Sequence, residues 1–239
     1  MIKELKDIKN TEVNLFGGKA ANLGFLLQNG YNVPEGFCIS TKINNFDNKI
    51  KDKIFKKFIE LNSKVAVRSS ATAEDSKKLS FAGQFDTFLN IKNEKDLINS
   101  IKKCKNSVKS KRAISYAKNK KIINIKMAVI VQKMINSDFA GVIFTIDPVN
   151  KKDILIEIVK GLGNKLVSGK VTPNSYFIDR NSFNIKNKTA FFNLDKNNIK
   201  KLAETSLKIE SLYKHPQDIE FAVKNREIFI LQSRPITTL

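Results

Sequence analysis

The sequence has few of the side chains that build disulfides and zinc sites. It contains two cysteines, Cys38 and Cys104, and one histidine, His215. The cysteines lie far apart and belong to no Cys-x-x-Cys or cysteine–histidine cluster, so neither a disulfide framework nor a zinc site is predicted. Such cysteine use fits a reducing compartment. A lone histidine beside a proline is more often a surface or capping residue than a phosphoryl acceptor, so we assign no chemistry to His215.

Long apolar runs are missing as well. The N-terminal segment, MIKELKDIKN, carries charges where a signal peptide needs an apolar core. No apolar run approaches the about 20 residues that a membrane span requires. We therefore expect a cytoplasmic protein that has no membrane partner.

Arginine is scarce although the net charge is strongly positive. The formal charge is +20, yet only 5 of the 43 basic residues are arginine. Arginine is the side chain that most often recognises bases and binds phosphates with two hydrogen bonds. In addition, no aromatic residues alternate with the lysines, as they do in proteins that stack on single-stranded nucleic acid. This composition weakens the case for nucleic acid, and an anionic small substrate is equally consistent with the charge. A lysine-rich nucleic-acid-binding protein stays open as the last of three hypotheses.

The hydrophobic pattern changes near residue 125. Hydrophobic residues make up 41% of the chain, which is enough for one large domain or two lobes. Before residue 125, the spacing predicts helices at 20–28, 46–61 and 95–118 and a strand at 65–68. After it, the pattern predicts strands at 127–131, 141–146, 154–159 and 176–178, a surface loop at 181–188, a helix at 197–213 and a hairpin at 218–235. We expect an α+β fold with a helix-rich N-terminal lobe, residues 1–125, and a strand-rich C-terminal lobe, residues 126–239.

The C-terminal hairpin collects polar side chains at the end away from its turn. Because side chains alternate between the faces of a strand, Ile219, Phe221 and Val223 form a core face. A three-residue loop at 224–226 would add Phe229 and Leu231 to that face. The opposite face then gathers four polar residues: Asp218, Glu220, Gln232 and Arg234.

This polar group suits a metal ion and a phosphate. Two carboxylates and a neutral amide oxygen are ligands that Mg²⁺ accepts, and an arginine beside them suits phosphate oxygens. The alternative is an exposed sheet face with a solvated ion pair, because charged residues are common on surfaces.

Two segments of the N-terminal half could supply further phosphate contacts. In FGGKAANLG, Gly17 and Gly18 allow close backbone approach at the start of a helix, and Lys19 adds a cation. The alternative is a flexible turn with an exposed lysine. In VAVRSSATAED, Arg68 ends a strand and is followed by small polar residues. The alternative for Arg68 is an ion pair at the rim of the fold.

Two strands carry polar residues whose setting needs an explanation. The apolar strand in AVIVQKM runs into Gln132, Lys133 and Met134, and such an exit could be a hinge whose backbone reads an adenine edge. Glu157 lies inside the apolar strand ILIEIV, where an unpaired carboxylate would be costly. We expect Glu157 to have a partner, which is either a structural lysine or arginine, or a ligand.

Taken in order, these stretches resemble the nucleotide-binding domain of the phosphoenolpyruvate synthase and pyruvate phosphate dikinase family. The ATP-binding part of rifampicin phosphotransferases is also similar. The resemblance covers nearly the whole chain through these motifs: GGKAANLG, NVPEGFCIST, VAVRSSATAED, SFAGQFDTFLN, RAISY, VQKM, AGVIFTIDP, IEIVKGLGNKLVSGKVTPNSYFID, DIEF and ILQSRP. It implies an ATP-grasp-like fold that holds ATP and Mg²⁺ in a cleft between two lobes.

The resemblance also implies roles for the residues that match the family motifs. Lys19, Arg68 and Arg234 correspond to catalytic cations at the phosphates, and Glu220 and Gln232 to the metal ligands. The remaining nucleotide-binding positions are Gly17, Gly18, Gln132, Lys133, Met134, Glu157 and Asp218.

The chain departs from the family pattern in three respects. Asn164 and Asn174 stand where acidic residues are common in the family, which puts metal or lid behaviour in doubt. The segments 41–65 and 91–127 are short for the family. Because the sequence stops just after the ILQSRP motif, we expect the phosphohistidine domain and the domain that binds phosphoenolpyruvate to be missing.

The resemblance implies an ATP-dependent phosphotransferase, incomplete on its own. It would pass phosphate from ATP to a histidine on a separate protein, or to an unidentified acceptor. The second hypothesis is a non-catalytic ATP-binding module that regulates a partner.

Overall fold

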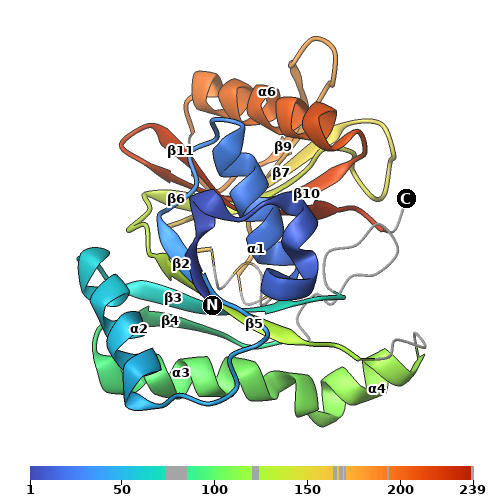
Figure 1. The fold of residues 1–239 in the computed structure, drawn as a ribbon. Coiled ribbons are helices and arrows are strands. Elements are labelled where there is room, and N and C mark those ends of the chain that lie inside the picture. The colour runs from blue at the N-terminus through green and yellow to red at the C-terminus, as the bar shows by residue number, and fades with distance from the viewer. Residues whose placement is uncertain are drawn as a thin grey trace. The chain divides into compact units, whose positions relative to one another are not determined.

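A computed structural model describes residues 1–73, 85–119, 124–163, 166, 169, 171–192 and 194–237. The chain forms two compact units, Met1–Met134 and Ile135–Leu239 (Figure 1). The hydrophobic pattern predicts a division after residue 125, whereas strand β5 (Met127–Lys133) pairs with β2 and β3 of the first unit. The apolar run that seemed to begin the second lobe is therefore a central strand of the first.

The first unit is built on a five-stranded antiparallel sheet with the order β1-β2-β5-β3-β4. Strand β3 (Val65–Ala71) runs beyond the predicted strand at 65–68 and pairs with β5 along its whole length. The pattern did not predict the other three strands, which are β1 (Ile2–Glu4), β2 (Gly36–Ile39) and β4 (Thr87–Ile91).

Helices cover both faces of this sheet (Figure 1). Helix α1 (Val13–Gln28) contacts β3 and β5 on one face. Helices α2 (Asn48–Glu60) and α3 (Glu94–Asn106) lie on the other face, where a buried cluster includes Ile54, Phe58, Leu97, Ile101, Val65, Val67, Val129 and Val131. Because side chains alternate along β3, Arg68 and Ser70 point to the side of α1.

Short segments complete the first unit. The turns Leu5–Asp7 and Asn10–Glu12 precede α1. The helix predicted at 95–118 is broken, because α3 ends at Asn106 and the turn Ser107–Lys109 leads into α4 (Lys111–Asn119). Within the described ranges, no helix combines the length and apolarity that crossing a bilayer requires.

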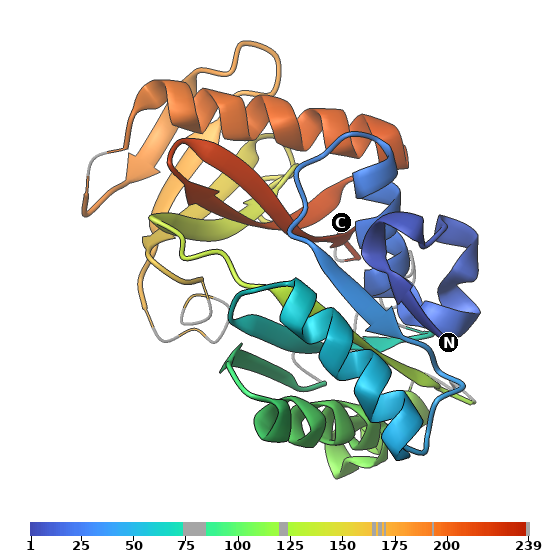
Figure 2. The ribbon, with the colours of Figure 1, turned by 60° about the vertical axis from the view of Figure 1, so that its left-hand side comes forward.

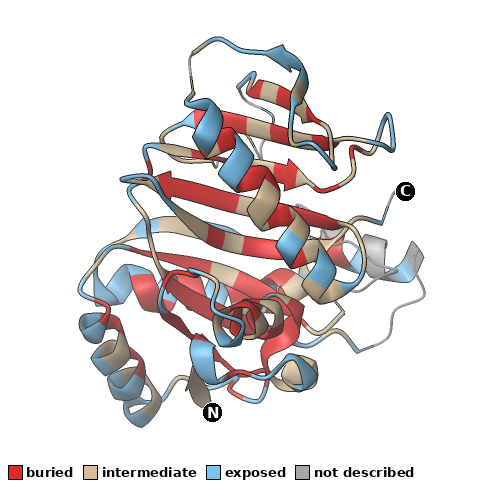
Figure 3. Ribbon diagram, turned by 90° about the horizontal axis from the view of Figure 1, so that it is seen from above, coloured by how far each residue is buried: buried red, intermediate tan, exposed pale blue. Residues whose placement is uncertain are grey.

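The second unit is a six-stranded antiparallel sheet with the order β11-β10-β6-β7-β8-β9. Helix α6 (Lys196–Tyr213) covers one face through Ile199, Leu202 and Ile209 (Figure 2). Burial alternates along the inner strands β6, β7 and β8, as the striped colouring in Figure 3 shows. The strands are β6 (Phe139–Phe144), β7 (Ile154–Lys160), β8 (Asn174–Ile178), β9 (Ile185–Thr189), β10 (Gln217–Lys224) and β11 (Glu227–Pro235).

Strand β9 corrects the surface loop predicted at 181–188. Its residues are mostly exposed, as expected for a polar edge strand, and it pairs with β8 from Ser175↔Thr189 to Ile178↔Ile185. The alternation is hidden in the sequence because neither side of this strand is deeply buried.

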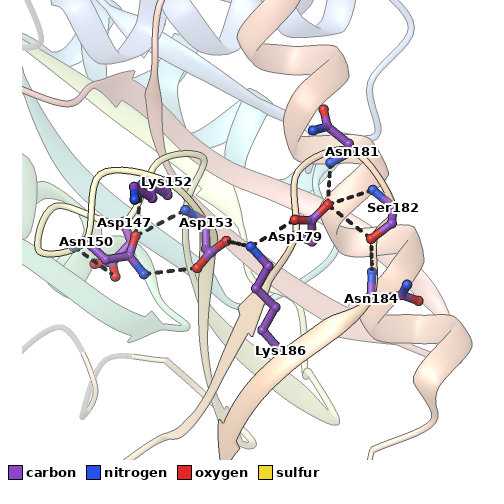
Figure 4. Close-up of polar contacts among 9 residues, drawn as sticks. All are labelled: Asp147, Asn150, Lys152, Asp153, Asp179, Asn181, Ser182, Asn184 and Lys186. Carbon is purple, nitrogen blue, oxygen red and sulfur yellow. Dashed lines mark hydrogen bonds and ion pairs between the residues drawn. The ribbon is translucent and has the colours of Figure 1, made fainter.

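A chain of polar contacts holds two turns of the second unit (Figure 4). The Nζ of Lys186 on β9 bridges the Oδ1 of Asp153 at 2.8 Å and the Oδ2 of Asp179 at 2.9 Å. Asp179 also accepts hydrogen bonds from the backbone of the turn after β8, at 3.0 Å from Asn181 and 2.9 Å from Ser182. Lys186 and these amides lower the pKa of Asp179. Lys186 already supplies the cation between the two carboxylates, so the cluster is structural.

Buried Lys105 gives the first unit a pH dependence that can be measured. Its Nζ donates to the carbonyl oxygens of Ser40 at 2.8 Å and Met127 at 2.7 Å. Burial lowers the pKa of Lys105 to about 8. The unfolded chain then binds more protons than the folded chain between pH 8 and the ordinary lysine pKa of 10.5, so the free energy of unfolding rises with pH in this window.

We expect this rise to be missing when Lys105 is replaced by methionine. Between pH 7.5 and 10, the unaltered chain should gain up to about 2 kcal/mol relative to Lys105→Met, after allowance for partial exposure. Urea unfolding at several pH values measures the difference, with exposed Lys102→Met as the control. Parallel curves for the unaltered chain and Lys105→Met would contradict the prediction.

Candidate functional site

The glycine pair of the first unit lies against the end of strand β3. Helix α1 is kinked at Gly17, which has φ of 78° and ψ of 166°. A Cβ atom added to Gly17 would lie 2.2 Å from the carbonyl oxygen of Ser70. Only glycine therefore fits this position, because it accepts the positive φ and leaves room for the strand.

Ser70 ties the two segments together. Its Oγ donates to the carbonyl oxygen of Phe16 at 2.8 Å and accepts from the amide of Ala20 at 3.1 Å. Lys19 lies within the turn that these two bonds close. Arg68 precedes Ser70 by two positions on β3 and shares its face of the sheet. The first unit thus brings together the two segments, 50 residues apart, that the sequence analysis assigns to phosphate binding.

The exit of strand β5 is held by contacts within the first unit. Gln132 is buried and its Nε2 donates to the carbonyl oxygen of Pro34 at 3.1 Å. The backbone amide of Lys133 donates to Glu35 and that of Met134 to Lys64, both at 2.9 Å. These three donors therefore already have acceptors within the protein. The sequence-based prediction of a hinge that binds an adenine edge did not include these contacts.

The C-terminal hairpin has a shorter turn than the sequence analysis predicts. Strands β10 and β11 are joined by the two residues Asn225 and Arg226, both with positive φ, instead of a three-residue loop. A bulge at Leu231 then shifts the register, so Ile230 is buried where Phe229 and Leu231 were expected. Beyond the bulge, the polar residues face each other as Glu220↔Gln232 and Asp218↔Arg234.

The four polar residues therefore do share one face, although the predicted route to that register is wrong. Two errors compensate: the turn is one residue shorter than expected, and the bulge restores the parity that the shorter turn would have changed. A two-residue turn with both φ angles positive matches the twist of the strands.

Asp218 and Arg234 form a half-enclosed ion pair. The Nε and one terminal nitrogen of Arg234 lie 2.8 and 2.5 Å from the Oδ2 of Asp218. The other carboxylate oxygen, Oδ1, is buried and has no hydrogen-bond partner among the described residues. Burial raises the pKa of Asp218, the charge of Arg234 opposes this, and the charge of Glu220 adds to it. A buried acceptor without a partner is costly, so it marks a place where a ligand could bind.

Glu157 extends this polar surface across the sheet. The strand registers place Gln232, Glu220, Val142 and Glu157 opposite one another in a single row, so their side chains point to the same face. This is the face away from α6, since the alternate residues Ile156 and Ile158 are buried. Burial, together with the charges of Asp147 and Asp218, raises the pKa of Glu157.

Among the described residues, Glu157 has no cationic partner. None of the salt bridges found in the described part of the chain includes this carboxylate. The sequence predicted that Glu157 pairs either with a structural lysine or arginine or with a ligand. Because the described residues include no such cation, the ligand is the alternative that remains. A half-buried acid with a raised pKa is a candidate for a binding site.

The donor set fits Mg²⁺ only if the ligand completes it. The described residues contain no group of three or more His, Cys, Asp or Glu side chains that could hold a metal ion by themselves. Magnesium in nucleotide sites is commonly held by one or two carboxylates and by phosphate oxygens. The carboxylate of Glu220, the amide oxygen of Gln232 and the unsatisfied Oδ1 of Asp218 match that partial set.

Asn174 has a structural role that explains one departure from the family pattern. It is fully buried, and its amide makes two bonds to the segment after β9: Oδ1 accepts from Phe191 at 2.7 Å and Nδ2 donates to the carbonyl oxygen of Phe192 at 2.7 Å. An aspartate could only accept, so it could not make both bonds. Asn164, the other departure, lies outside the described residues.

We expect Asn174→Asp to destabilise the second unit by about 2–4 kcal/mol. The change would bury a carboxylate beside the carbonyl oxygen of Phe192, which now accepts a hydrogen bond. Urea unfolding measures the loss, with exposed Asn187→Asp as the matched control. Equal stability of the two variants would show that the amide donor is unimportant.

His215 is engaged locally. Its Nδ1 lies 2.8 Å from the Nε2 of Gln217, whose Oε1 accepts from the buried hydroxyl of Ser233. The sequence analysis missed this network and also the bonds of Ser70. Ser233 is 16 positions from Gln217, and Ser70 is 50 and 54 positions from its two partners on α1, so neither serine carries a local signal of its partner.

Comparisons with known proteins give the site its family context. The model of the pyruvate phosphate dikinase AMP/ATP-binding domain matches residues 43–193 and 185–239. A probable phosphoenolpyruvate synthase of Archaeoglobus fulgidus is 34% identical over 98% of this chain and 41% of its own length. An uncharacterized phosphotransferase of Bacillus subtilis is 34% identical over 94% of this chain and 34% of its own length. A rifampicin phosphotransferase of Bacillus cereus is 30% identical over 100% of this chain and 36% of its own length. The chain thus spans well under half of these relatives.

Solved structures support the fold. A D-alanine–D-alanine ligase from Bacillus anthracis matches with a TM-score of 0.51 at 8% identity, over 96% of this chain and 59% of the ligase. The protein PH1788 from Pyrococcus horikoshii matches with a TM-score of 0.52 at 16% identity, over 97% of both chains. The expected α+β, ATP-grasp-like fold is confirmed. Together with the match over residues 43–239, this establishes that the chain belongs to the pyruvate phosphate dikinase AMP/ATP-binding domain family.

Proposed function

We propose that this domain binds Mg·ATP and transfers a phosphoryl group from it to an acceptor. The observation that carries the proposal is the polar end of the C-terminal hairpin. There, Glu220 and Gln232 lie beside a buried Asp218–Arg234 pair that leaves one carboxylate oxygen unsatisfied. Membership of an ATP-binding domain family gives this arrangement its ligand.

In this proposal, the first unit supplies cations and amides to the phosphates. Lys19 and Arg68 contact phosphate oxygens, and the backbone of Gly17 and Gly18 lets the phosphates approach closely. The support is the tight fit of the Gly17 turn against β3. Phosphoryl transfer requires little of a protein besides such positioning and charge stabilisation.

The second unit would hold the metal. Glu220 and Gln232 are the proposed magnesium ligands. When bound, Mg²⁺ neutralises charge on the phosphates and orients them. Arg234 is proposed to contact phosphate oxygens, and its bonds to Asp218 fix the guanidinium in place.

The remaining positions are assigned to the nucleoside. We propose that Gln132, Lys133 and Met134 lie at its adenine end. Because the amides of Lys133 and Met134 already have acceptors, contacts there would involve other groups of this segment or a rearrangement. Glu157, which has a raised pKa and no cationic partner in the described part of the chain, is proposed to accept hydrogen bonds from ligand hydroxyls.

The proposed acceptor is a histidine on a separate protein, or else an unidentified acceptor. Relatives named as phosphotransferases and phosphoenolpyruvate synthases are more than twice as long as this chain. Buried Cys38 and Cys104 are free thiols, which fits a reducing, ATP-containing compartment such as the cytoplasm.

The test is to incubate the protein with ATP labelled at the β or the γ phosphate, with and without an extract of the source cells. The proposal predicts magnesium-dependent formation of AMP or ADP and an acid-labile phosphoprotein. Binding of ATP without turnover under both conditions would favour the non-catalytic module instead. Tight RNA binding that falls steeply with salt and that ATP does not displace would favour the nucleic-acid hypothesis.

A further inference from the structure

Ser70 stands in an unusual relation to helix α1. It is fully buried on β3, and its hydroxyl bonds the helix on both sides of the Gly17 kink, at Phe16 and at Ala20. Its carbonyl oxygen fills the space where any Cβ of residue 17 would lie. The kink in α1 and strand β3 therefore fit closely together, and Ser70 holds them in contact.

The kink makes a new helix start at the glycine pair. After the non-helical Gly17, the chain turns helical again, and the first amides of a helix have no partner within it. At most helix starts, the side chain of the preceding residue accepts one of these amides. Gly17 has no side chain, and the Oγ of Ser70 accepts the amide of Ala20 in its place.

We propose that Ser70 is a positioning residue that sets Lys19 for phosphate binding. By capping the helix start from another strand, it fixes the turn that carries Lys19 relative to Arg68, two positions earlier on the same strand face. Ser70 does not contact ATP in this account. The inference rests on the proposed function, because only there is Lys19 assigned to bind phosphate.

Ser70→Ala removes the cap and leaves the bulk of the strand unchanged. The amide of Ala20 and the carbonyl of Phe16 would each lose the bond to Ser70, so the turn should loosen around Lys19. We expect the Kd for Mg·ATP to rise about tenfold, and the amide of Ala20 to exchange its hydrogen faster than in the unaltered chain. Calorimetry measures the first quantity and hydrogen exchange the second.

Two further variants separate positioning from a general loss of stability. Ser206→Ala is the matched control, because Ser206 is also a buried serine whose hydroxyl donates to a backbone carbonyl, that of Ala203 at 2.8 Å. It should leave ATP affinity unchanged. If Ser70 acts through Lys19, adding Ser70→Ala to Lys19→Met should weaken ATP binding no further than Lys19→Met alone.

The outcomes distinguish this inference from the proposed function. No Mg·ATP binding by the unaltered chain would overturn the proposed function itself. If the unaltered chain binds ATP and Ser70→Ala binds it equally well, the role of Ser70 is overturned alone. Fully additive losses in the double variant would also overturn it, because Ser70 would then act independently of Lys19.

Discussion

Gly17→Ala should lose most of the stability of the first unit. Alanine would have to adopt a φ of 78° and place its Cβ 2.2 Å from the carbonyl oxygen of Ser70, which belongs to the backbone of β3 and cannot swing aside. We expect a loss of about 3 kcal/mol or more in the free energy of unfolding, measured by urea denaturation. ATP affinity should fall too, because the displaced turn carries Lys19.

Gly30→Ala is the matched control for this prediction. Gly30 has nearly the same backbone angle, with φ of 79°, but a Cβ there would meet no atom within 4 Å. The control should therefore cost only the backbone strain, about 1 kcal/mol. If both variants lose the same stability, the contact between the Gly17 turn and Ser70 is not what the structure indicates.

Arg234→Met should be the most damaging single change in the second unit. It leaves the carboxylate of Asp218, only 7% exposed, without its cation. Breaking a buried pair from one side costs about 3–5 kcal/mol, because the remaining charge is buried and uncompensated. Urea unfolding at pH 7 measures the loss.

The same variant has a pH signature. Burial already raises the pKa of Asp218, and Arg234 counters this, so removing Arg234 raises the pKa further. An acid whose pKa is higher in the folded chain binds protons on folding, so the variant should regain stability as pH falls from 7 towards 5. Asp218→Asn in the Arg234→Met background should recover most of the loss at pH 7. A double variant that is no more stable than Arg234→Met would contradict this account of the pair.

The sequence predicted those parts of the fold that have strong local signals. The apolar run 127–131, the helix at 197–213 and the hairpin at 218–235 all lie where expected, although the first belongs to the other unit. Helical spacing and strand alternation arise within one segment, so they can be found without knowing what the segment packs against. The strands with which a segment pairs cannot be found in this way. For that reason the sequence analysis assigned β5 to the wrong unit.

Features that depend on distant partners escaped prediction. Strands β1, β2 and β4 are three to five residues long and carry too little alternation to be recognised. The hairpin shows a subtler limit. Its polar face was predicted from parity alone, and an unforeseen bulge at Leu231 corrected the wrong turn length.

Site residues divide in the same way. Lys19, Arg68 and Glu220 stood out because charged residues interrupt glycine-rich or apolar segments. Ser70 did not, and Asn174 was noted only as a departure from the family pattern, since the importance of both lies in hydrogen bonds to backbone atoms far along the chain. For a small polar residue in a buried strand, it is therefore useful to ask which backbone group its side chain bonds.

The most direct test of the account is a calorimetric titration of ATP with and without Mg²⁺, carried out on the unaltered chain, Lys19→Met and Glu220→Gln. The account predicts magnesium-dependent binding that each substitution weakens by about tenfold or more, because each removes a charge that is proposed to contact the phosphates or their metal ion. Lack of magnesium-dependent binding at millimolar ATP, or binding that both substitutions leave unchanged, would contradict it.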